Sequence, residues 1–330
     1  MLPLRLMVLA PVLFFALLGC GAADGASALS YIGSLRAART ANTVVLDTRP
    51  AARCETRSVA GARCLPPSAL LGPHGRLPAF RQLVWVLGTA GLTGRETVVV
   101  AGDDPQRRGF VAGVLFLLGQ AQVRVLSPRL TALLNAHRVP VGTGTGTSMV
   151  AQPLFQGQAR AGLIVFRGEL LRALRSSHPP VLFDGRSDAR YWGKVVTARR
   201  GGHIPGARSL PADTLQTRGS SAQRTVDVPA GAIAYAQTPA STIAYFTRLT
   251  AGLGAPVRVF VQGWRDWADH TAMPVAAETL PSSFPSATPP PRSAPRGGTS
   301  VSASLFAVSI TSLLFAIAAV AIAMRRKQWI

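Results

Sequence analysis

The segment GAIAYAQTPASTIAYF (231–246) has the pattern of a short apolar strand, a tight loop and a helix. Loops in this position of an α/β protein bind anions or hold nucleophiles, because the helix N-terminus presents free N–H groups. This loop contains no Cys, His or charged side chain, and it offers no base that could activate a hydroxyl. The hydroxyls therefore predict helix capping. The loop residues are Ala236, Gln237, Thr238, Pro239, Ala240 and Ser241.

A second strand, loop and helix pattern lies in the N-terminal half. Here TVVVAGDDPQRRGF (97–110) places a polar loop after an apolar strand. Arg107 and Arg108 open the following helix and could grip an anion, although a solvated turn is the alternative for a loop of mixed charge. The candidate residues of this loop are Ala101, Gly102, Asp103, Asp104 and Arg107.

Two Asp-x-Arg motifs also follow apolar runs: Asp47 with Arg49, and Asp184 with Arg186. At the ends of parallel strands they would lie at the edge of a cleft, where we expect ion pairs or loop-ordering hydrogen bonds. For His203, in a later turn, we expect a structural role. The five histidines show no metal-ligand spacing, so the sequence predicts neither a metal nor another cofactor.

The three cysteines are Cys20, Cys54 and Cys64. Cys54 and Cys64 lie close enough in the chain to form a disulfide in an oxidising compartment. Two alternatives remain: a pair of free thiols, or a reactive Cys54, whose neighbours Arg53 and Arg57 would favour its thiolate.

Both ends of the chain predict export and membrane attachment. Residues 1–27 have one Arg, an apolar run and then small residues, which is typical of a signal peptide. LLGC (17–20) resembles a lipoprotein box that would lipidate Cys20, whereas ASA (26–28) resembles an ordinary cleavage site. At the other end, 301–324 is uncharged and long enough to span a bilayer.

The basic tail 325–330 follows the apolar segment, so we expect a cytoplasmic tail and folded domains on the extracytoplasmic, periplasmic side of the cell membrane. A Pro/Ser-rich stalk is predicted at 277–300. Alternatively, the C-terminal segment is a sorting tail that is removed.

The chain of 330 residues has a formal charge of +21, and nearly all of its basic residues are Arg. No compact run of basic residues occurs in the predicted folded region. We therefore interpret the charge as a solvated Arg-rich surface and expect no nucleic-acid partner.

An internal repeat organises the middle of the chain. VVLDTRPAARCE (44–55) is echoed by VLFDGRSDARYW (181–192), and three further segments recur in the same order. The repeat predicts two α/β domains, 28–141 and 158–276, joined by a linker at 142–157. Apolar strands alternate with helical segments in each copy, which predicts a central parallel sheet flanked by helices.

The second copy resembles the rhodanese (thiosulfate sulfurtransferase) family. The resemblance rests on DGR (184–186), GGHIPGARSLP (201–211) and VQGWRDW (261–267), and it extends over about 44–267. The first copy is degraded, since SVAGA replaces HIPGA and no Trp pair follows. In its tandem arrangement the chain resembles the two-domain members of the family.

The resemblance implies a cysteine whose thiolate accepts a sulfane sulfur from thiosulfate and passes it to a thiol or cyanide. The equivalent positions are Ala236 in the second copy and Ala101 in the first, and neither is a nucleophile. Pro239 replaces a common Gly and donates no N–H, and Ser241 replaces a basic residue.

Two functions follow from the sequence. The first is a membrane-anchored, catalytically inactive module that binds a small thiosulfate-like anion or a protein partner. The alternative is an active sulfurtransferase that uses the displaced thiol of Cys54. Accessibility of that thiol separates the two.

Overall fold

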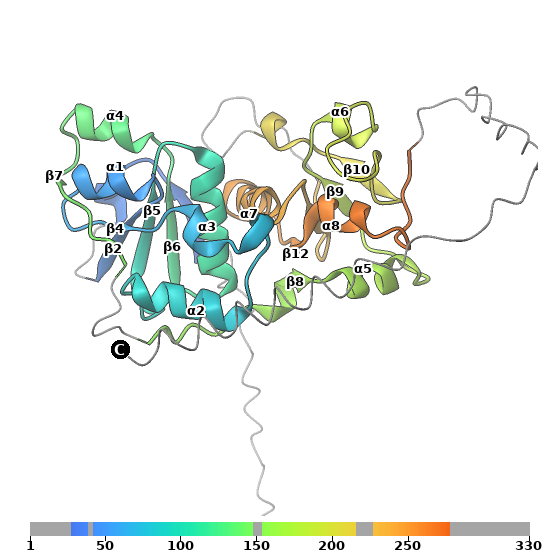
Figure 1. Cartoon of the computed structure of the whole chain (residues 1–330), viewed down its shortest axis with the longest axis horizontal. Coiled ribbons are helices and arrows are strands. Elements are labelled where there is room, and N and C mark those ends of the chain that lie inside the picture. The colour runs from blue at the N-terminus through green and yellow to red at the C-terminus, as the bar shows by residue number, and fades with distance from the viewer. Residues whose placement is uncertain (1–27, 39–41, 148–153, 216–226, 278–330) are drawn as a thin grey trace, which may run out of the picture. The chain divides into compact units, whose positions relative to one another are not determined.

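The computed structural model describes residues 28–38, 42–147, 154–215 and 227–277 (Figure 1). The predicted signal peptide with Cys20, the membrane segment 301–324 and the basic tail lie outside these residues, as does all but the first residue of the predicted stalk. Within the described ranges, no helix is both long and apolar enough to cross a bilayer.

The N-terminal half forms a five-stranded parallel sheet in the order β1-β6-β5-β2-β4. Its central strands are the runs of Val and Leu that the sequence predicted, and most of their side chains are buried. The strands are β1 (Leu29–Ile32), β2 (Thr43–Asp47), β4 (Arg63–Cys64), β5 (Thr97–Ala101) and β6 (Gln122–Leu126). The helices are α1 (Ala51–Thr56), α2 (Phe80–Thr89), α3 (Pro105–Leu117) and α4 (Leu130–Asn135), and β3 (Ser58–Val59) pairs antiparallel with β7 (Val141–Gly142).

The C-terminal half forms a second parallel sheet in the order β8-β12-β11-β9-β10. In both sheets the first strand in the chain lies at one edge, followed by the fifth, fourth, second and third, so the strand order is the same. The strands are β8 (Ile164–Val165), β9 (Leu182–Asp184), β10 (Ala207–Ser209), β11 (Ile233–Tyr235) and β12 (Arg258–Phe260). The helices are α5 (Arg167–Leu174), α6 (Asp188–Tyr191), α7 (Pro239–Thr247) and α8 (Gly263–Asp269).

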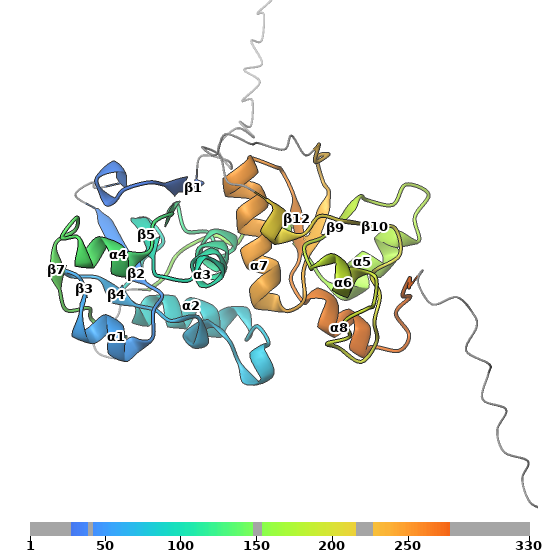
Figure 2. The same ribbon diagram turned by 90° about the horizontal axis from the view of Figure 1, so that it is seen from above.

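Helices α3 and α7 join the two halves, and they lie side by side in Figures 1 and 2. The contact is close because α3 presents Gly109 and Gly113 to α7. A Cβ on Gly113 would lie 2.5 Å from Ile243 Cγ2 and 2.5 Å from Thr247 Oγ1. Thr247 Oγ1 also donates a hydrogen bond to the Gly109 carbonyl at 2.8 Å. One hydrophobic core therefore runs through both halves.

The described parts of the predicted linker lie against the first half. The Gly144 and Thr145 N–H groups donate to the carbonyls of Cys54 and Ala62, at 2.9 and 2.8 Å. The Gln156 N–H donates to the Thr93 carbonyl at 2.8 Å. These backbone hydrogen bonds fix the two ends of the linker on the first half.

Replacing Gly113 with Ala should lower the free energy of unfolding by about 1–3 kcal/mol, because a buried contact with no free space is overpacked. The helix propensity of alanine, about 1 kcal/mol better than that of glycine, opposes part of this loss. Gly162→Ala is the matched control, since a Cβ there meets nothing within 4 Å. Denaturant unfolding of both variants tests the interface, and a Gly113→Ala protein as stable as wild type would contradict it.

Candidate functional site

The predicted loop lies between β11 and α7, at the carboxyl end of the second sheet. Thr238 is the N-cap of α7, and Thr238 and Ser241 form a reciprocal capping box. The Thr238 N–H donates to Ser241 Oγ at 2.8 Å, and the Ser241 N–H donates to Thr238 Oγ1 at 3.3 Å. Both hydroxyls thus cap the helix, as the sequence predicted.

The loop has few free N–H groups for an anion. The Ala236 N–H donates to Thr242 Oγ1 at 2.9 Å, and those of Thr238 and Ser241 are used in the capping box. Pro239 has no N–H at all. Four of the six loop positions therefore have no backbone donor to offer, and the cradle that an anion at a helix N-terminus requires is largely closed.

Helix α8 fixes the other side of the loop. The Trp264 N–H donates to the Ala236 carbonyl at 2.8 Å, and the Arg265 N–H donates to the Gln237 carbonyl at 3.0 Å. Gln237 is 7% exposed, yet neither polar atom of its side-chain amide has a hydrogen-bond partner in the described residues. A buried amide without a protein partner is uncommon, because an unsatisfied donor and acceptor cost free energy.

The loop opens into a pocket of about 530 Å³ that both halves line. Such a volume suits a small organic molecule rather than only an inorganic ion. The first half contributes Tyr31, Pro105, Gln106, Arg108 and Ser127, and the second half contributes Gly185, Arg186, Ser187, Arg190, Ala212, Asp213, Ala236, Gln237, Ser241, Ala244, Tyr245 and Arg248.

The pocket has an excess of positive charge, with four arginines and one exposed carboxylate, Asp213. Arg108 and Arg248 act electrostatically on Tyr31. Burial raises the pKa of the Tyr31 phenol, and the two guanidiniums oppose that shift. The Nε atoms of Arg108 and Arg248 are buried without a partner among the described residues. The pocket is therefore suited to an anion.

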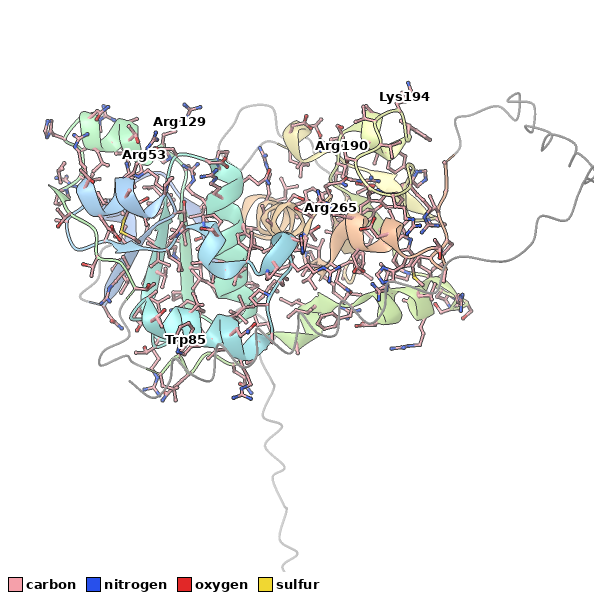
Figure 3. The ribbon with its side chains drawn as sticks, viewed as in Figure 1. Arg53, Trp85, Arg129, Arg190, Lys194 and Arg265 are labelled. Atoms are coloured by element: carbon pink, nitrogen blue, oxygen red, sulfur yellow. A yellow bond between two sulfur atoms is a disulfide. The ribbon has the colours of Figure 1, made fainter. Side chains whose placement is uncertain are left out.

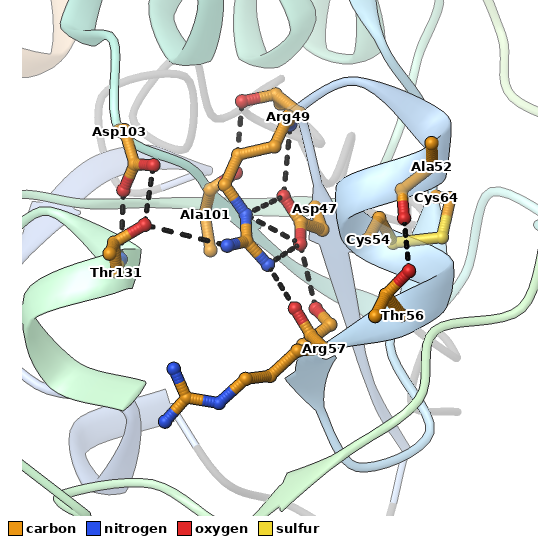
Figure 4. Close-up of polar contacts among 12 residues, drawn as sticks. Asp47, Arg49, Ala52, Cys54, Thr56, Arg57, Cys64, Ala101, Asp103 and Thr131 are labelled. Atoms are coloured by element: carbon orange, nitrogen blue, oxygen red, sulfur yellow. Dashed lines mark hydrogen bonds and ion pairs between the residues drawn. A yellow bond between two sulfur atoms is a disulfide. The ribbon is translucent and has the colours of Figure 1, made fainter. Parts of the chain in front are cut away.

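The two Asp-x-Arg motifs form matching buried ion pairs. Arg49 Nη2 lies 2.7 Å from Asp47 Oδ2, and Arg186 Nη2 lies 2.6 Å from Asp184 Oδ2. Each Arg also donates its backbone N–H and Nε to the same carboxylate. Figure 4 shows the first pair, whose guanidinium reaches on to the Arg57 carbonyl at 2.6 Å. These residues order the strand ends rather than offering a free charge.

His203 and the Trp pair pack in the second half. His203 is 4% exposed and stacks on Tyr191, with ring centroids 3.9 Å apart. Trp264 lies under the Arg186 guanidinium at 4.3 Å, and the Trp267 Nε1–H donates to the Pro274 carbonyl at 2.7 Å. All three side chains are buried, which agrees with a structural role for His203.

The loop of the first half is filled by its own side chains. Asp103 Oδ2 accepts a hydrogen bond from Thr131 Oγ1 at 2.6 Å. Burial acts to raise the pKa of Asp103, but its hydrogen bonds to Thr131 and the charges of Arg49 and Arg108 outweigh burial and hold the pKa below its usual value. Arg108 Nη1 donates to the Gly102 carbonyl at 2.6 Å. These contacts order the loop of the first half.

Three predicted residues of this loop have other roles. Ala101 is fully buried at the end of β5, and its carbonyl accepts a hydrogen bond from Thr48 Oγ1 at 3.0 Å. Asp104 is the N-cap of α3 and accepts from two backbone N–H groups. Arg107 is exposed, with its Nε 3.8 Å from Asp104 Oδ2, and it does not line the pocket. Its neighbour Arg108 does.

Cys54 and Cys64 are joined in a disulfide, with their Cα atoms 5.8 Å apart. Cys54 lies on α1 with no exposed surface, and Cys64 lies at the end of β4 with 3% exposed. The bond lies beside the Asp47–Arg49 pair (Figure 4). In this state neither sulfur is a free thiol, and neither residue lines the pocket.

Sequence reasoning missed Tyr31, Arg190 and Arg248. Ser241 and Tyr245 of α7 and its C-cap Arg248 have the i, i+4, i+7 spacing of one helical face, so the sequence did carry a signal for this part of the pocket. Arg190 lies inside the repeated segment 181–192, but nothing in that segment marked it as a residue of a binding site. Tyr31 is more than two hundred residues from Arg248 in the chain, and only the packing of the halves brings them together.

Comparisons with known proteins agree with the fold. Residues 167–270 match the family described as Rhodanese-like domain. A protein named thiosulfate sulfurtransferase from Azotobacter vinelandii is 28% identical over 259 residues, which cover 70% of this chain and 90% of the relative.

Solved structures with a similar fold include a probable thiosulfate sulfurtransferase, with 23% identity and a TM-score of 0.54 over 72% of this chain and 98% of that one. Tum1 from Saccharomyces cerevisiae has 17% identity and a TM-score of 0.59, over 72% and 94%. YnjE has 20% identity and a TM-score of 0.59, and the chain spans 63% of its length.

These comparisons relate residues 167–270 to the rhodanese-like domain, and a longer part of the chain to a protein named thiosulfate sulfurtransferase at 28% identity. The matched residues 167–270 contain the loop 236–241, the Asp184–Arg186 pair and the Trp pair. The family match does not extend to the first half. What relates the first half to the second is that their two sheets have the same strand order.

Removing the disulfide should lower the free energy of unfolding by about 2–3 kcal/mol, the value expected for a loop of roughly ten residues. The test is denaturant unfolding of a Cys54→Ala/Cys64→Ala double variant against wild type. Reductant serves as the control, since it should destabilise wild type and leave the double variant unchanged. Equal stability of the two proteins without reductant would contradict a structural bond.

Proposed function

We propose that this chain is a rhodanese-like binding protein without sulfurtransferase activity, which holds an anion in the pocket between its two halves. The observation that carries the proposal is the loop 236–241, whose N–H groups are largely bonded within the protein and where the resemblance places Ala236 at the position of the family's nucleophile. The tandem arrangement of two rhodanese-like domains is part of the same proposal, and the matching strand orders support it.

The chemistry of the loop supports binding rather than group transfer. A persulfide needs a sulfur atom to carry it and several N–H donors to stabilise its charge. Ala236 provides no sulfur, and the Ala236, Thr238 and Ser241 N–H groups are already bonded within the protein. Arginine and glutamine side chains replace backbone donors as the means of holding an anion.

The alternative is an active thiosulfate sulfurtransferase, the activity in the name of the Azotobacter vinelandii relative. It requires a displaced nucleophile, for which Cys54 is the candidate. A reactive thiolate must be free and accessible. Cys54 is buried and bonded to Cys64, which favours the binding function.

Membrane attachment and the extracytoplasmic side are also part of the proposal. They rest on the sequence of 1–27 and of 301–324, with lipidation of Cys20 or cleavage after the small residues 26–28 as the two modes of N-terminal processing. The disulfide supports an oxidising compartment, because such bonds are rare in the reducing cytosol. A protein partner at the same pocket is the second kind of ligand that the proposal includes.

We expect no thiosulfate:cyanide sulfurtransferase activity from the purified chain or from an Ala236→Cys variant. The new thiol should react with an alkylating reagent, which shows that it is accessible, yet fail to turn over because the loop N–H groups are occupied. The Azotobacter vinelandii relative serves as the positive control. Turnover by the wild-type chain that disappears in Cys54→Ser would overturn the proposal in favour of a displaced nucleophile.

A further inference from the structure

The pocket extends along one face of α7. Ser241 lines it near the N-terminus of the helix, and Arg248 lines it about two turns further on. At the rise of an α-helix, seven residues separate these positions by about 10 Å. The pocket is therefore long as well as wide enough for an organic molecule.

Each end of the pocket offers basic and polar groups. At the loop end, Gln237 and Arg190 line the pocket from the segments that follow β11 and β9, whose ends are paired. At the other end, Arg248 and Tyr31 line it with Arg108, whose Nη groups also donate to the carbonyls of Gly102, Ser127 and Pro128. Within the described residues, the structure gives no hydrogen bond or ion pair to the guanidiniums of Arg190 and Arg248.

The wall that α7 contributes between the two ends is apolar, because Ala244 and Tyr245 lie between Ser241 and Arg248, the C-cap of the helix. Asp213, Ser127 and Ser187 line the pocket elsewhere. The Tyr245 hydroxyl donates to the Leu210 carbonyl at 2.8 Å, so its polar atom is already satisfied. A ligand that fits has charged ends and an apolar middle.

We propose that the pocket binds an elongated organic dianion, with one anionic group at Arg190 and Gln237 and the other at Arg108, Arg248 and Tyr31. This inference rests on the proposed function and adds to it the length and charge of the ligand. A small inorganic ion such as thiosulfate can occupy one end only. A ligand that reaches both ends gains a second charge-assisted contact, which raises its affinity.

The test uses α,ω-dicarboxylates of increasing length, namely succinate, adipate, suberate and sebacate, with thiosulfate as the short inorganic anion. Binding to the full chain is measured by isothermal titration calorimetry at constant ionic strength, because surface charge effects depend on salt. Affinity should rise with length and be highest for suberate or sebacate, by about tenfold over succinate, the gain expected of one additional charge-assisted hydrogen bond.

Three variants locate the two ends. Arg248→Gln and Arg190→Gln should each weaken the long dicarboxylates by about tenfold, because a long ligand uses both ends. Succinate and thiosulfate occupy one end, so only one of the two substitutions should weaken them. Arg53→Gln is the charge-matched control, since Arg53 is exposed on the first half, whereas Arg190 lies on the second (Figure 3).

The possible failures of the two proposals are distinguishable. If no anion of any length binds, the anion-binding function itself is wrong. If anions bind with an affinity independent of length, or if either Arg248→Gln or Arg190→Gln leaves the affinity for sebacate unchanged, the function stands and the two-ended pocket is overturned. The wild-type length series gives this answer even if a variant does not fold.

Discussion

The close contact between α3 and α7 is the constraint on which the rest of the structure depends. Two helices can approach this closely only where one of them has no side chains, and Gly109 and Gly113 provide that surface. The contact joins the two halves in one hydrophobic core. Because residues of both halves line the pocket, its shape depends on how closely α3 and α7 pack.

Within each half, a buried Asp–Arg pair holds the strand ends. A buried ion pair is stable only when its remaining donors and acceptors are also satisfied, and both arginines meet this requirement through backbone carbonyls, Arg57 in one case and Gly202 in the other. The same buried Asp–Arg ion pair occurs in both halves, within the segments of the sequence that are repeated.

The loop 236–241 uses its backbone for structure. Capping by Thr238 and Ser241 stabilises the start of α7, but it uses the N–H groups that would otherwise be free to hold an anion. The groups that remain beside the loop are the side chains of the surrounding elements that line the pocket. Among them is Gln237, whose amide is buried and unpartnered in the described residues.

The sequence by itself determined the α/β class and the two parallel sheets, because the spacing of apolar residues within each segment distinguishes strands from helices. It also determined that Ala236 and Ala101 are not nucleophiles, because that depends only on the type of the residue. From the spacing of Cys54 and Cys64, a disulfide was one of three interpretations; the others were two free thiols and a reactive Cys54. Only the tertiary structure decided that Arg108 rather than Arg107 lines the pocket, since adjacent helical residues face different directions. Only the packing of α3 on α7 brought Tyr31 to Arg248, because contacts between residues so distant in the chain have no signal in either segment alone.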